Sequence, residues 1–447
     1  MWLYKWCVRM PNLRSPEYSF SEWRTSSLRE LIVNHDGMRK PVKESDRSTG
    51  PYPYYGASGI VDYVDSYLFD GEFLLIAEDG ENLRTRQTPV AFIARGKFWV
   101  NNHAHVVTAN DKADTRFLMY ALQIADIDKY LSGAVMPKLT QGNLNQIEIP
   151  CPPLETQHAI AHILGALDDK IELNRRMNAT LEKMARALFQ SWFMDFDPVR
   201  ARMEGRQPVG LDAATAALFP DSFEDSPLGS IPRGWKITTL GEACEAGGGN
   251  IQTGPFGTQL HASDYVVEGI PSIMPSDLRD NRIETKTISR IREADAARLN
   301  VYRVQVGDVV YSRRGDVERR ALIRHAENGW LCGTGCLRVR FGARGLNSHF
   351  AAAYLGTAEA RAWVVRHAVG ATMPNLNTSI LGALPLIVPS VELQARFAEI
   401  VGAWDERGTI ALHESRTLST LRDALLPKLL SGELSVASLE SSIAASV

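Results

Sequence analysis

The stretch Gly133–Leu139, GAVMPKL, occurs a second time as Gly370–Leu376, GATMPNL, 237 residues further along the chain. The same offset holds downstream, where Pro152, Glu155, Gln157, Ala161, Ile163, Gly165, Ala166, Asp168, Leu181, Ala187 and Leu188 correspond to Pro389, Glu392, Gln394, Ala398, Ile400, Gly402, Ala403, Asp405, Leu418, Ala424 and Leu425. One offset over more than fifty positions indicates duplication. Because this period is too long for a solenoid, we expect two domain-sized halves related by a pseudo-twofold axis.

A long helix is predicted beyond each copy of this stretch. The segment Glu155–Trp192 lacks proline and nearly lacks glycine, and its 38 residues would form a rod of about 57 Å. Apolar residues with a 4-3 spacing mark a seam, interrupted by two asparagines, at Ile160, Leu164, Leu167, Ile171, Asn174, Asn178, Leu181, Ala185 and Leu188. The second copy runs from Glu392 to about Leu430 and offers Phe397, Val401, Trp404, Ala411, Leu418 and Leu425. Gly408 interrupts it, so we expect a kink or weak turn there.

The two seams are assigned to contacts with a partner helix. Such length and periodicity favour an antiparallel pair of the two helices, while the alternative is that each packs on its own domain as a core helix. The residues predicted to bind a partner are Ile160, Leu164, Leu167, Ile171, Leu181, Leu188, Phe397, Val401, Trp404, Leu418 and Leu425.

A β-rich module rich in Gly, Pro and Tyr precedes each helix. Trp23–Leu28 opens the first module, Trp235–Leu240 opens the second, and the turn and strand of Gly71–Ile76 parallel Gly307–Ser312. The fold class is therefore α/β (α+β), with two similar globular domains separated by two long antiparallel helices. The expected domains are an extension (1–20), a module (21–152), a helix (153–192), a connector with a short helix at 212–218 (193–230), a module (231–389), a helix (390–432) and a tail (433–447).

Composition restricts the class of protein. The 447 residues are 45% hydrophobic and 23% charged, as in globular proteins of two to four domains. Without a signal peptide or a membrane-spanning segment, we expect a cytoplasmic protein whose five cysteines are reduced. Cys332 and Cys336 form a close pair that no further ligand completes, so no metal site is expected. The net charge of −3 does not by itself favour a nucleic-acid partner, so basic groups must be local or come from another protein.

Several further motifs occur in a fixed order along the chain. They are Tyr54–Ile60 (YYGASGI), the Gly71 strand, the two Met-Pro turns, the Pro152–Gln157 helix start (PPLETQ), Ser191–Pro198 (SWFMDFDP) and Thr253–Gly257 (TGPFG). With the repeat, they make the chain from about Ser21 to Leu434 resemble the DNA specificity subunit of type I restriction-modification systems. Residues 1–20 depart from that pattern.

This resemblance implies two target-recognition domains that each read half of a bipartite site on double-stranded DNA. It also implies helices that set the spacing and dock two methyltransferase subunits, with translocating restriction subunits joining the assembly. The chain itself would bind no cofactor, whereas the methyltransferase would use S-adenosylmethionine and the restriction subunit ATP and Mg. Such a system methylates host DNA and defends against phage.

Candidate DNA-contacting residues are polar or aromatic residues near expected strand ends, since arginine and amide side chains read base edges. In the first module they are Tyr52, Tyr54, Tyr55, Ser58, Arg84, Arg86, Asn101, Asn102 and His103. In the second they are Gln252, Thr253, Arg313, Arg314, Arg319 and Arg320, and the repeated turn adds Lys138 and Asn375. The alternatives are half-buried structural tyrosines, a solvated arginine hairpin with internal ion pairs, and turn residues that cap the next segment.

No catalytic residue is predicted. Asp197–Arg200 (DPVR) lacks the second proline and the aromatic residue of a methyltransferase motif, and Gly247–Gly249 is not followed by the Lys-Ser/Thr of a phosphate loop. Asp277 and Glu284 are too few for a metal-dependent nuclease. The sequence therefore predicts a non-catalytic DNA-recognition subunit. The alternatives are a coiled-coil protein-interaction scaffold without DNA specificity and, with less support, a solitary nuclease or methyltransferase.

Overall fold

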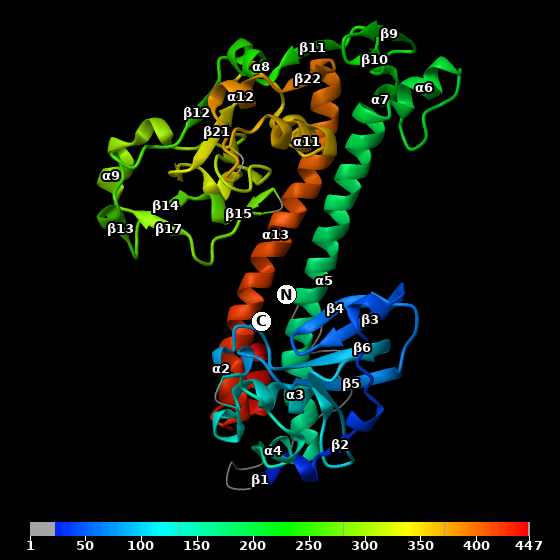
Figure 1. The fold of residues 1–447 in the computed structure, drawn as a ribbon, viewed down its shortest axis with the longest axis vertical. Coiled ribbons are helices and arrows are strands. Elements are labelled where there is room, and N and C mark those ends of the chain that lie inside the picture. The colour runs from blue at the N-terminus through cyan, green and yellow to red at the C-terminus, as the bar shows by residue number, and fades with distance from the viewer. Residues whose placement is uncertain (1–22, 134, 280, 371, 446–447) are drawn as a thin grey trace. The chain divides into compact units, whose positions relative to one another are not determined.

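The computed structural model describes residues 23–445, except for positions 134, 280 and 371. The expected extension at residues 1–20 and the alanines of both GAxMPxL turns therefore lie outside the described residues. The chain divides into two compact units, one of Met1–Arg175 with Ala411–Val447 and the other of Arg176–Ile410. We call them unit 1 and unit 2 and describe each by itself (Figure 1).

Unit 1 is built on a six-stranded sheet with the order β2-β7-β5-β6-β3-β4. Its pairs are antiparallel except for β3 with β6. The strands are β2 (Ile32–Asn34), β3 (Thr49–Gly56), β4 (Gly59–Val64), β5 (Phe69–Ala77), β6 (Ala91–Val100) and β7 (Ala104–Ala109), and a separate pair joins β1 (Arg24–Ser27) to β8 (Glu148–Cys151). The helices confined to this unit are α2 (Asn82–Thr85), α3 (Thr115–Ile124), α4 (Gln141–Leu144) and α14 (Val436–Ala445).

Unit 2 contains two four-stranded sheets, with the orders β12-β21-β18-β19 and β13-β17-β14-β20. Their strands are β12 (Asn250–Thr253), β13 (Tyr265–Val266), β14 (Ile270–Ile273), β17 (Ser289–Ile291), β18 (Val309–Ser312), β19 (Arg320–Leu322), β20 (Leu331–Cys332) and β21 (Cys336–Arg340). Three antiparallel pairs accompany them, β9 (Phe223–Ser226) with β10 (Gly229–Pro232), β11 (Lys236–Thr239) with β22 (Pro385–Val388), and β15 (Leu278–Arg279) with β16 (Arg282–Ile283). The helices confined to this unit are α6 (Asp197–Met203), α7 (Ala213–Ala217), α8 (Leu240–Gly247), α9 (Glu293–Arg298), α10 (Ser348–Tyr354), α11 (Ala358–His367) and α12 (Thr378–Gly382).

The central strands of the two modules are buried on both faces. In β5, Leu74 and Ile76 join the core cluster that includes helix residues, while Leu75 faces a second cluster around Phe69 and Phe98. In β18, Val309 and Tyr311 join the helix-containing core of unit 2, while Val310 belongs to a separate cluster. Alternation of side chains across a strand produces both patterns. The mixed helix-and-sheet class predicted from the sequence is therefore confirmed.

This correspondence corrects the alignment of the two strands. Ile76 is equivalent to Tyr311, not to Ser312, because both face the helix-containing core. Gly71 lies inside β5, whereas Gly307 precedes β18, so the expected turn before the strand is found only in the second module. A one-residue shift exchanges the faces of a strand, and with both faces buried the sequence pattern could not detect it.

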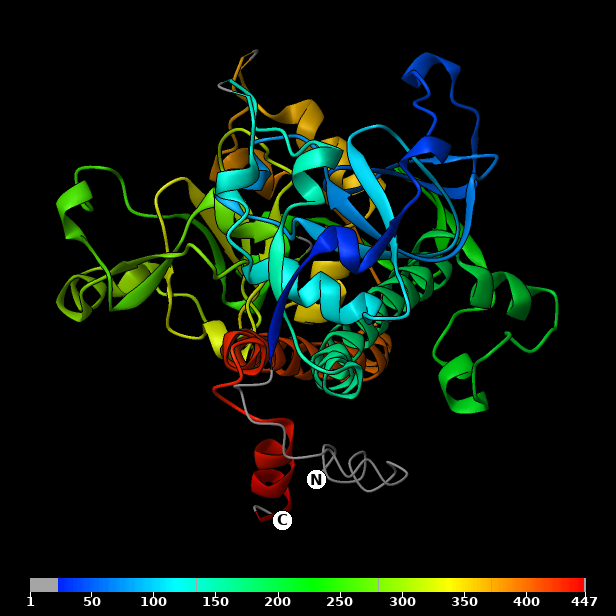
Figure 2. The same ribbon diagram turned by 90° about the horizontal axis from the view of Figure 1, so that it is seen from below.

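Two long helices, α5 (Leu154–Phe189) and α13 (Val391–Leu430), contribute one half each to both units. In unit 1, Leu164 shares a core cluster with Leu425, Leu426 and Leu429. In unit 2, the ring centroids of Phe189 and Phe397 lie 5.5 Å apart. The beginning of each helix thus lies beside the end of the other, and Figures 1 and 2 show them side by side. The predicted antiparallel pair is confirmed, and the helices also pack on their modules.

Gly408 does not interrupt the second helix. The helical assignment runs from Val391 to Leu430 without a break, so the expected weak turn is absent there. A Cβ at Gly408 would lie 3.2 Å from both Asn178 Oδ1 and Arg282 Nη2. The glycine leaves space for two neighbouring side chains and the helical backbone continues through it.

The segment predicted as a connector is part of the unit 2 core. After a π-helical turn at Gln190–Met194, α6, α7 and the β9-β10 hairpin lead into the second module. Trp192, Phe193, Val199 and Phe219 are buried in one cluster with Trp235. Asp212 caps α7 by accepting a hydrogen bond from the Thr215 N–H, which fits the short helix expected there.

The repeated glutamines tie each long helix to its module in the same way. Gln157, fully buried, accepts a hydrogen bond from the N–H of Asp114 and donates to the carbonyl of Pro152. Gln394 accepts from the N–H of Asn347 and donates to the carbonyl of Pro389. Asp114 and Asn347 are the N-caps of α3 and α10. The glutamine recurs because each half needs this link between helix and module.

We predict that Gln157→Ala lowers the free energy of unfolding of unit 1 by about 2–4 kcal/mol, because it leaves buried backbone groups without partners. Urea-induced unfolding of the whole chain, followed by fluorescence, measures the change. The control is Gln146→Ala, which removes an exposed glutamine from the same unit. Equal midpoints for the two variants would contradict the role assigned to Gln157.

Candidate nucleic-acid interface

The repeated turn has the same backbone geometry in both units. In unit 1, Ser132 and Lys138 exchange two backbone hydrogen bonds of 2.8 Å, and in unit 2 Val369 and Asn375 exchange bonds of 3.0 and 2.9 Å. Gly133 has φ +87° at the start of this turn, and a Cβ there would lie 2.2 Å from the carbonyl oxygen of Met136. Gly370 has φ +113° and the same conflict with Met373. Glycine is therefore required at both positions.

Each turn docks against the loop that follows the central strand of its module. The Leu139 N–H donates to the carbonyl of Glu78 at 2.7 Å, and the Gly80 N–H donates to that of Pro137 at 3.1 Å. In unit 2, the Leu376 N–H donates to the carbonyl of Arg313 at 2.9 Å, and the Gly315 N–H donates to that of Pro374 at 3.0 Å. We call each turn, with the strand-end loop it contacts and the side chains beside them, a docked-turn surface.

The docked-turn surface of unit 1 brings together three predicted basic residues. Lys138 lies 3.3 Å from Glu78, and its side chain is 49% exposed. Arg84 donates to the carbonyl of Gly133 at 3.2 Å. His103 contacts the carboxylate of Asp79 at 2.8 Å and is also half exposed. The basic side chains of Lys138 and His103 are half exposed, whereas their acidic partners Glu78 and Asp79 are only 13% and 23% exposed.

The docked-turn surface of unit 2 has the same frame and different side chains. Arg314 is exposed and forms a β-bridge with Asn375. The guanidinium of Arg313 lies 6.0 Å from the ring centre of Phe256, which is 56% exposed. Asn375 has a buried Oδ1 for which no hydrogen-bond donor is found among the described residues. Arginine and asparagine beside an exposed aromatic ring are side chains that can read or stack on bases.

A protein-family model matches most of the chain. The model described as "Type I restriction modification DNA specificity domain" matches residues 20–183 and 232–421, which include both docked-turn surfaces. The chain belongs to the type I restriction-modification DNA specificity family. The recognition made from the sequence is confirmed.

Relatives in this family match either nearly the whole chain or a part of it. A type I restriction enzyme specificity subunit of Methanocaldococcus jannaschii is 23% identical over 93% of this chain and 94% of its own. A putative specificity subunit of Haemophilus influenzae is 46% identical, but over only 34% of this chain and 38% of its own. The crystal structure of the type I S subunit from M. genitalium shares the fold, with a TM-score of 0.58 and 18% identity over 94% of this chain and 99% of its own.

Four predicted DNA-contacting residues make contacts inside the protein. Tyr54 is 1% exposed and donates to the carbonyl of Val42. Arg86 donates to carbonyls at the end of α3 and just beyond it. Asn101, 9% exposed, accepts from the N–H of His103, and half-buried Arg320 of β19 donates to the carbonyl of Ala352. These four side chains have partners inside the protein, and their contact with DNA stays a prediction.

The other candidates lie outside the docked-turn surfaces. Ser58 is exposed in the hairpin turn between β3 and β4, and Asn102 is exposed in the connection from β6 to β7. Tyr52 packs on Tyr67, and Tyr55 packs on Phe92 and Phe98. Gln252 accepts a hydrogen bond from Arg338 at 2.7 Å, half-buried Thr253 ends β12, and Arg319 pairs with Asp316 at 2.8 Å. Their roles in DNA binding stay predictions.

The residues of the helix seam are buried or half-buried. Ile160, Leu164, Leu167 and Phe397 are at most 2% exposed. Val401 and Leu418 are 9% exposed, and Ile171, Leu181, Leu188, Trp404 and Leu425 are half-buried. Their burial fits the predicted contact with the other long helix. Contact of these residues with other subunits stays a prediction.

Exposed apolar side chains at the turn tips escaped the sequence reasoning. Val135 is 95% exposed, Met136 62% and Met373 61%. The sequence analysis gives the repeated methionine, Met136 and Met373, no role beyond its motif. The signal for its exposure is that each methionine follows a glycine turn and precedes a proline.

Potential metal ligands are scattered in the described part of the chain. No group of three or more His, Cys, Asp or Glu residues there could hold a metal ion. Cys332 and Cys336 are buried, and burial raises the pKa of the Cys332 thiol to about 12. Asp277 accepts a hydrogen bond from the Met274 N–H.

Within residues 23–445, as far as the structure describes them, every helix is too short or too polar to span a membrane.

A buried charge network holds the turn of unit 1 in place. His105, 1% exposed, has Nδ1 2.6 Å from Asp36 Oδ2 and Nε2 2.8 Å from the carbonyl oxygen of Leu139. Both neighbours are acceptors, so the contacts fit a protonated ring that donates twice. Arg39 and Lys138 then pair with Glu78 at 2.6 and 3.3 Å. No short-range sequence pattern reveals this network, because Asp36 and His105 are 69 residues apart.

The network makes the stability of unit 1 acid-sensitive. Burial raises the pKa of Asp36, but the hydrogen bond and charge of His105, with the N–H of Val106, outweigh it and hold the pKa below its usual 3.8. A carboxyl whose pKa is lower in the folded state stabilises that state above pH 3.8 and loses this effect as the pH falls further.

We predict that Asp36→Asn destabilises unit 1 by about 3 kcal/mol at neutral pH, because it removes the nearer counter-charge of His105 and leaves only Glu78 at 3.8 Å. The variant should also lose less stability than the unchanged chain between about pH 4 and pH 3. Unfolding midpoints across this range test both effects, with exposed Asp46→Asn as the control. An Asp36→Asn protein with the same acid response as the control would contradict the network.

Proposed function

We propose that this chain is the DNA-recognition subunit of a type I restriction-modification complex and that each module reads one half of a bipartite site. One observation carries the proposal. The two units present the same docked-turn frame with different side chains, Lys138 in one and Asn375 in the other. A shared frame with divergent side chains is suited to reading two different half-sites with one geometry.

The side chains of each surface supply the required chemistry. Arg313 and Arg314 can form paired hydrogen bonds to guanine edges, whereas Asn375, whose Oδ1 is buried, offers only its amide N–H groups. Lys138, Arg84 and His103 suit phosphates and base acceptors. Phosphate oxygens would compete with Glu78 and Asp79 for these basic groups, and the half-exposed side chains of Lys138 and His103 would make the contact.

Catalysis would belong to partner proteins in this proposal. Two methyltransferase subunits would dock on the chain and use S-adenosylmethionine to methylate an adenine flipped out of the duplex. Restriction subunits would join them and use ATP and Mg to translocate and cleave. The chain itself would be non-catalytic, bind no cofactor and act in the cytoplasm as part of this complex.

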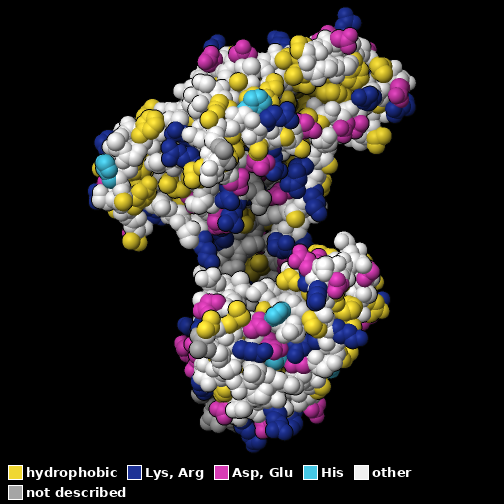
Figure 3. Space-filling view, in the orientation of Figure 1, with side chains coloured by type: hydrophobic (Ala, Val, Ile, Leu, Met, Phe, Trp, Pro, Cys, Tyr) yellow, Lys and Arg dark blue, Asp and Glu magenta, His cyan; other side chains and the backbone are white. Residues whose placement is uncertain are grey.

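The charge of the chain supports DNA binding that is shared with partner proteins. Figure 3 shows basic and acidic side chains interspersed on the visible face of each unit, without a continuous basic area on that face. With a net charge of −3, the chain alone would neutralise few phosphates. We therefore expect weak binding of DNA by the isolated protein. Nanomolar, sequence-specific affinity of the chain alone would contradict this part of the proposal.

The decisive experiment is to co-express the chain with the adenine methyltransferase encoded beside it and map modified bases by long-read sequencing. Methylation at one split motif with a fixed unspecified spacer, lost when this chain is removed, is the expected result. A motif unchanged by its removal, or an active methyltransferase without any motif, would instead favour the interaction scaffold.

Variants of the two surfaces should affect different halves of the motif. We expect Lys138→Ala to weaken or relax the half-site read by unit 1, and Arg314→Ala the half-site read by unit 2, by about 1–3 kcal/mol if the side chain contacts a base. The readout is the base preference at each position of the methylated motif. Exposed Arg344→Ala, in the loop between β21 and α10, is the control. Equal effects of one variant on both halves would contradict the assignment.

A further inference from the structure

Unit 2 contains a cavity of about 370 Å³ between the second module and the two long helices. Its wall includes residues of α5 from Asn178 to Gln190, of α13 from Val401 to Gly408, and of the module around β19 and α10. Five arginines line it against two acidic residues, Arg186, Arg282, Arg320, Arg324 and Arg361 against Glu182 and Asp405. The wall therefore has an excess of positive charge.

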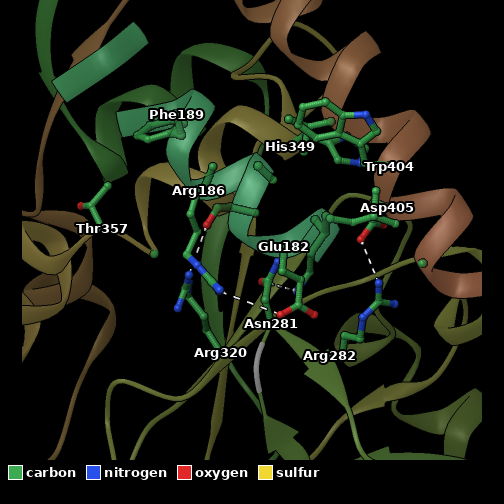
Figure 4. Close-up of a pocket in the computed structure, with 18 of the residues that line it drawn as sticks. Glu182, Arg186, Phe189, Asn281, Arg282, Arg320, His349, Thr357, Trp404 and Asp405 are labelled. Carbon is green, nitrogen blue, oxygen red and sulfur yellow. Dashed lines mark hydrogen bonds and ion pairs between the residues drawn. The ribbon is translucent and has the colours of Figure 1, made fainter. Parts of the chain in front are cut away.

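On one side of the cavity, two arginines are paired with an acidic residue of the wall. Asp405 accepts two hydrogen bonds from Arg324, at 2.6 and 2.7 Å, and one from Arg282 at 3.2 Å. The two arginine side chains are at most 20% exposed. Figure 4 shows Arg282 pointing to Asp405 at one side of the cavity. This carboxylate is already used by two guanidinium groups and cannot serve the arginines on the other side.

Arg320 lies on that other side without a counter-charge. Among the described residues no carboxylate lies within ion-pairing distance of it, and its one hydrogen bond is a long contact of 3.5 Å from Nη2 to the carbonyl of Ala352. Its Nε is buried without an acceptor. The backbone leaves room for the guanidinium, because a Cβ at Gly356 would lie 1.9 Å from Nη2. A buried guanidinium without an anion is costly, and here the fold makes space for one.

Two further arginines flank Arg320 at the more exposed part of the cavity. Arg186 of α5 is 69% exposed and pairs with Glu182 only at 3.9 Å. Arg361 of α11 is half exposed and contacts Glu318. Figure 4 shows Arg186 and Arg320 pointing into the same part of the cavity. Like charges in one place repel, and an anion between them would relieve that repulsion.

The rest of the wall is apolar and aromatic. Phe189, Trp404, Leu181 and Val401 line the cavity, and burial lowers the pKa of His349 beside them. A free phosphate would fill only part of a space of this size, which lies within the range of small-molecule sites. Arginines on one side of the cavity and apolar and aromatic side chains on the rest suit a ligand with a flat apolar group joined to an oxyanion.

We propose that this cavity binds a small molecule that carries a phosphate group, with the phosphate placed at Arg320 and Arg186. A dianion matches the excess of positive charge better than a single carboxylate, and guanidinium groups bind phosphate oxygens in pairs. The ligand would link the module, through Arg320, to helix α5, through Arg186. It would thereby fix the second module on its helices, a role separate from the contact with DNA.

The test is calorimetric titration of the full chain, in a buffer free of phosphate and low in chloride, with adenosine 5′-monophosphate, inorganic phosphate and adenosine. We expect the first to bind and adenosine to fail. Tighter binding of the nucleotide than of inorganic phosphate would indicate an organic phosphate, and equal binding would indicate the free anion. No binding of either phosphate compound at millimolar concentration would overturn the proposal.

Variants separate the site from a structural role of Arg320. Arg320→Gln and Arg186→Gln should each weaken binding about tenfold or more, whereas Arg319→Gln, in the same hairpin but paired with exposed Asp316, should not. Without phosphate, Arg320→Gln should melt at the same temperature as the unchanged chain or higher, since it removes an unpaired buried charge. Unchanged affinity in both site variants would overturn the proposal. Because Arg186 is largely exposed, its variant keeps the test valid if Arg320→Gln does not fold.

Discussion

Burial of two helix seams is the interaction on which both units depend. Ile160 and Phe397 occupy equivalent positions of the two helices, and each is at most 1% exposed within the core cluster of its unit. Neither helix could be stable alone in water at this length without such a surface to cover its apolar face. The same burial fixes where each module ends, because Pro152 and Pro389 precede the two helices, and Gln157 and Gln394 link the first turn of each helix to its module.

The docked turns show how one frame carries different chemistry. Glycine at 133 and 370, and the backbone bonds to the strand-end loop, determine the position of the turn without involving its side chains. Lys138 and Asn375 are therefore free to differ. The buried Asp36–His105 pair adds a support in unit 1 that leaves the exposed side chains unconstrained. Function in this family can change at such positions while the fold is kept.

The sequence predicted what depends on local pattern and repetition. The helices, their pairing, the strands that open each module and the docked turns follow from periodicity and from the constant offset. The order of strands does not, because pairing joins residues far apart. The internal contacts of Arg86 and Arg320 were not predicted for the same reason. Their partners, the end of α3 and the space over Gly356, are 36 or more residues away. The burial of Tyr54 was not predicted because burial on both faces of a sheet leaves no alternation to read.

The polar contacts along the helices of unit 1 break the symmetry of the repeat. Asp168 pairs with Arg422 at 2.6 Å, Lys170 with Glu414 at 3.1 Å, and Asn174 donates to Glu414 at 2.9 Å. In the first copy, the positions of Arg422 and Glu414 are Ala185 and Met177. If two α5 helices from separate chains paired in this register, all three contacts would be lost and Asn174 would face a methionine. During synthesis, α5 of each chain is made before α13. This difference disfavours pairing of α5 helices between neighbouring nascent chains and leaves the seam of α5 available for α13 of the same chain.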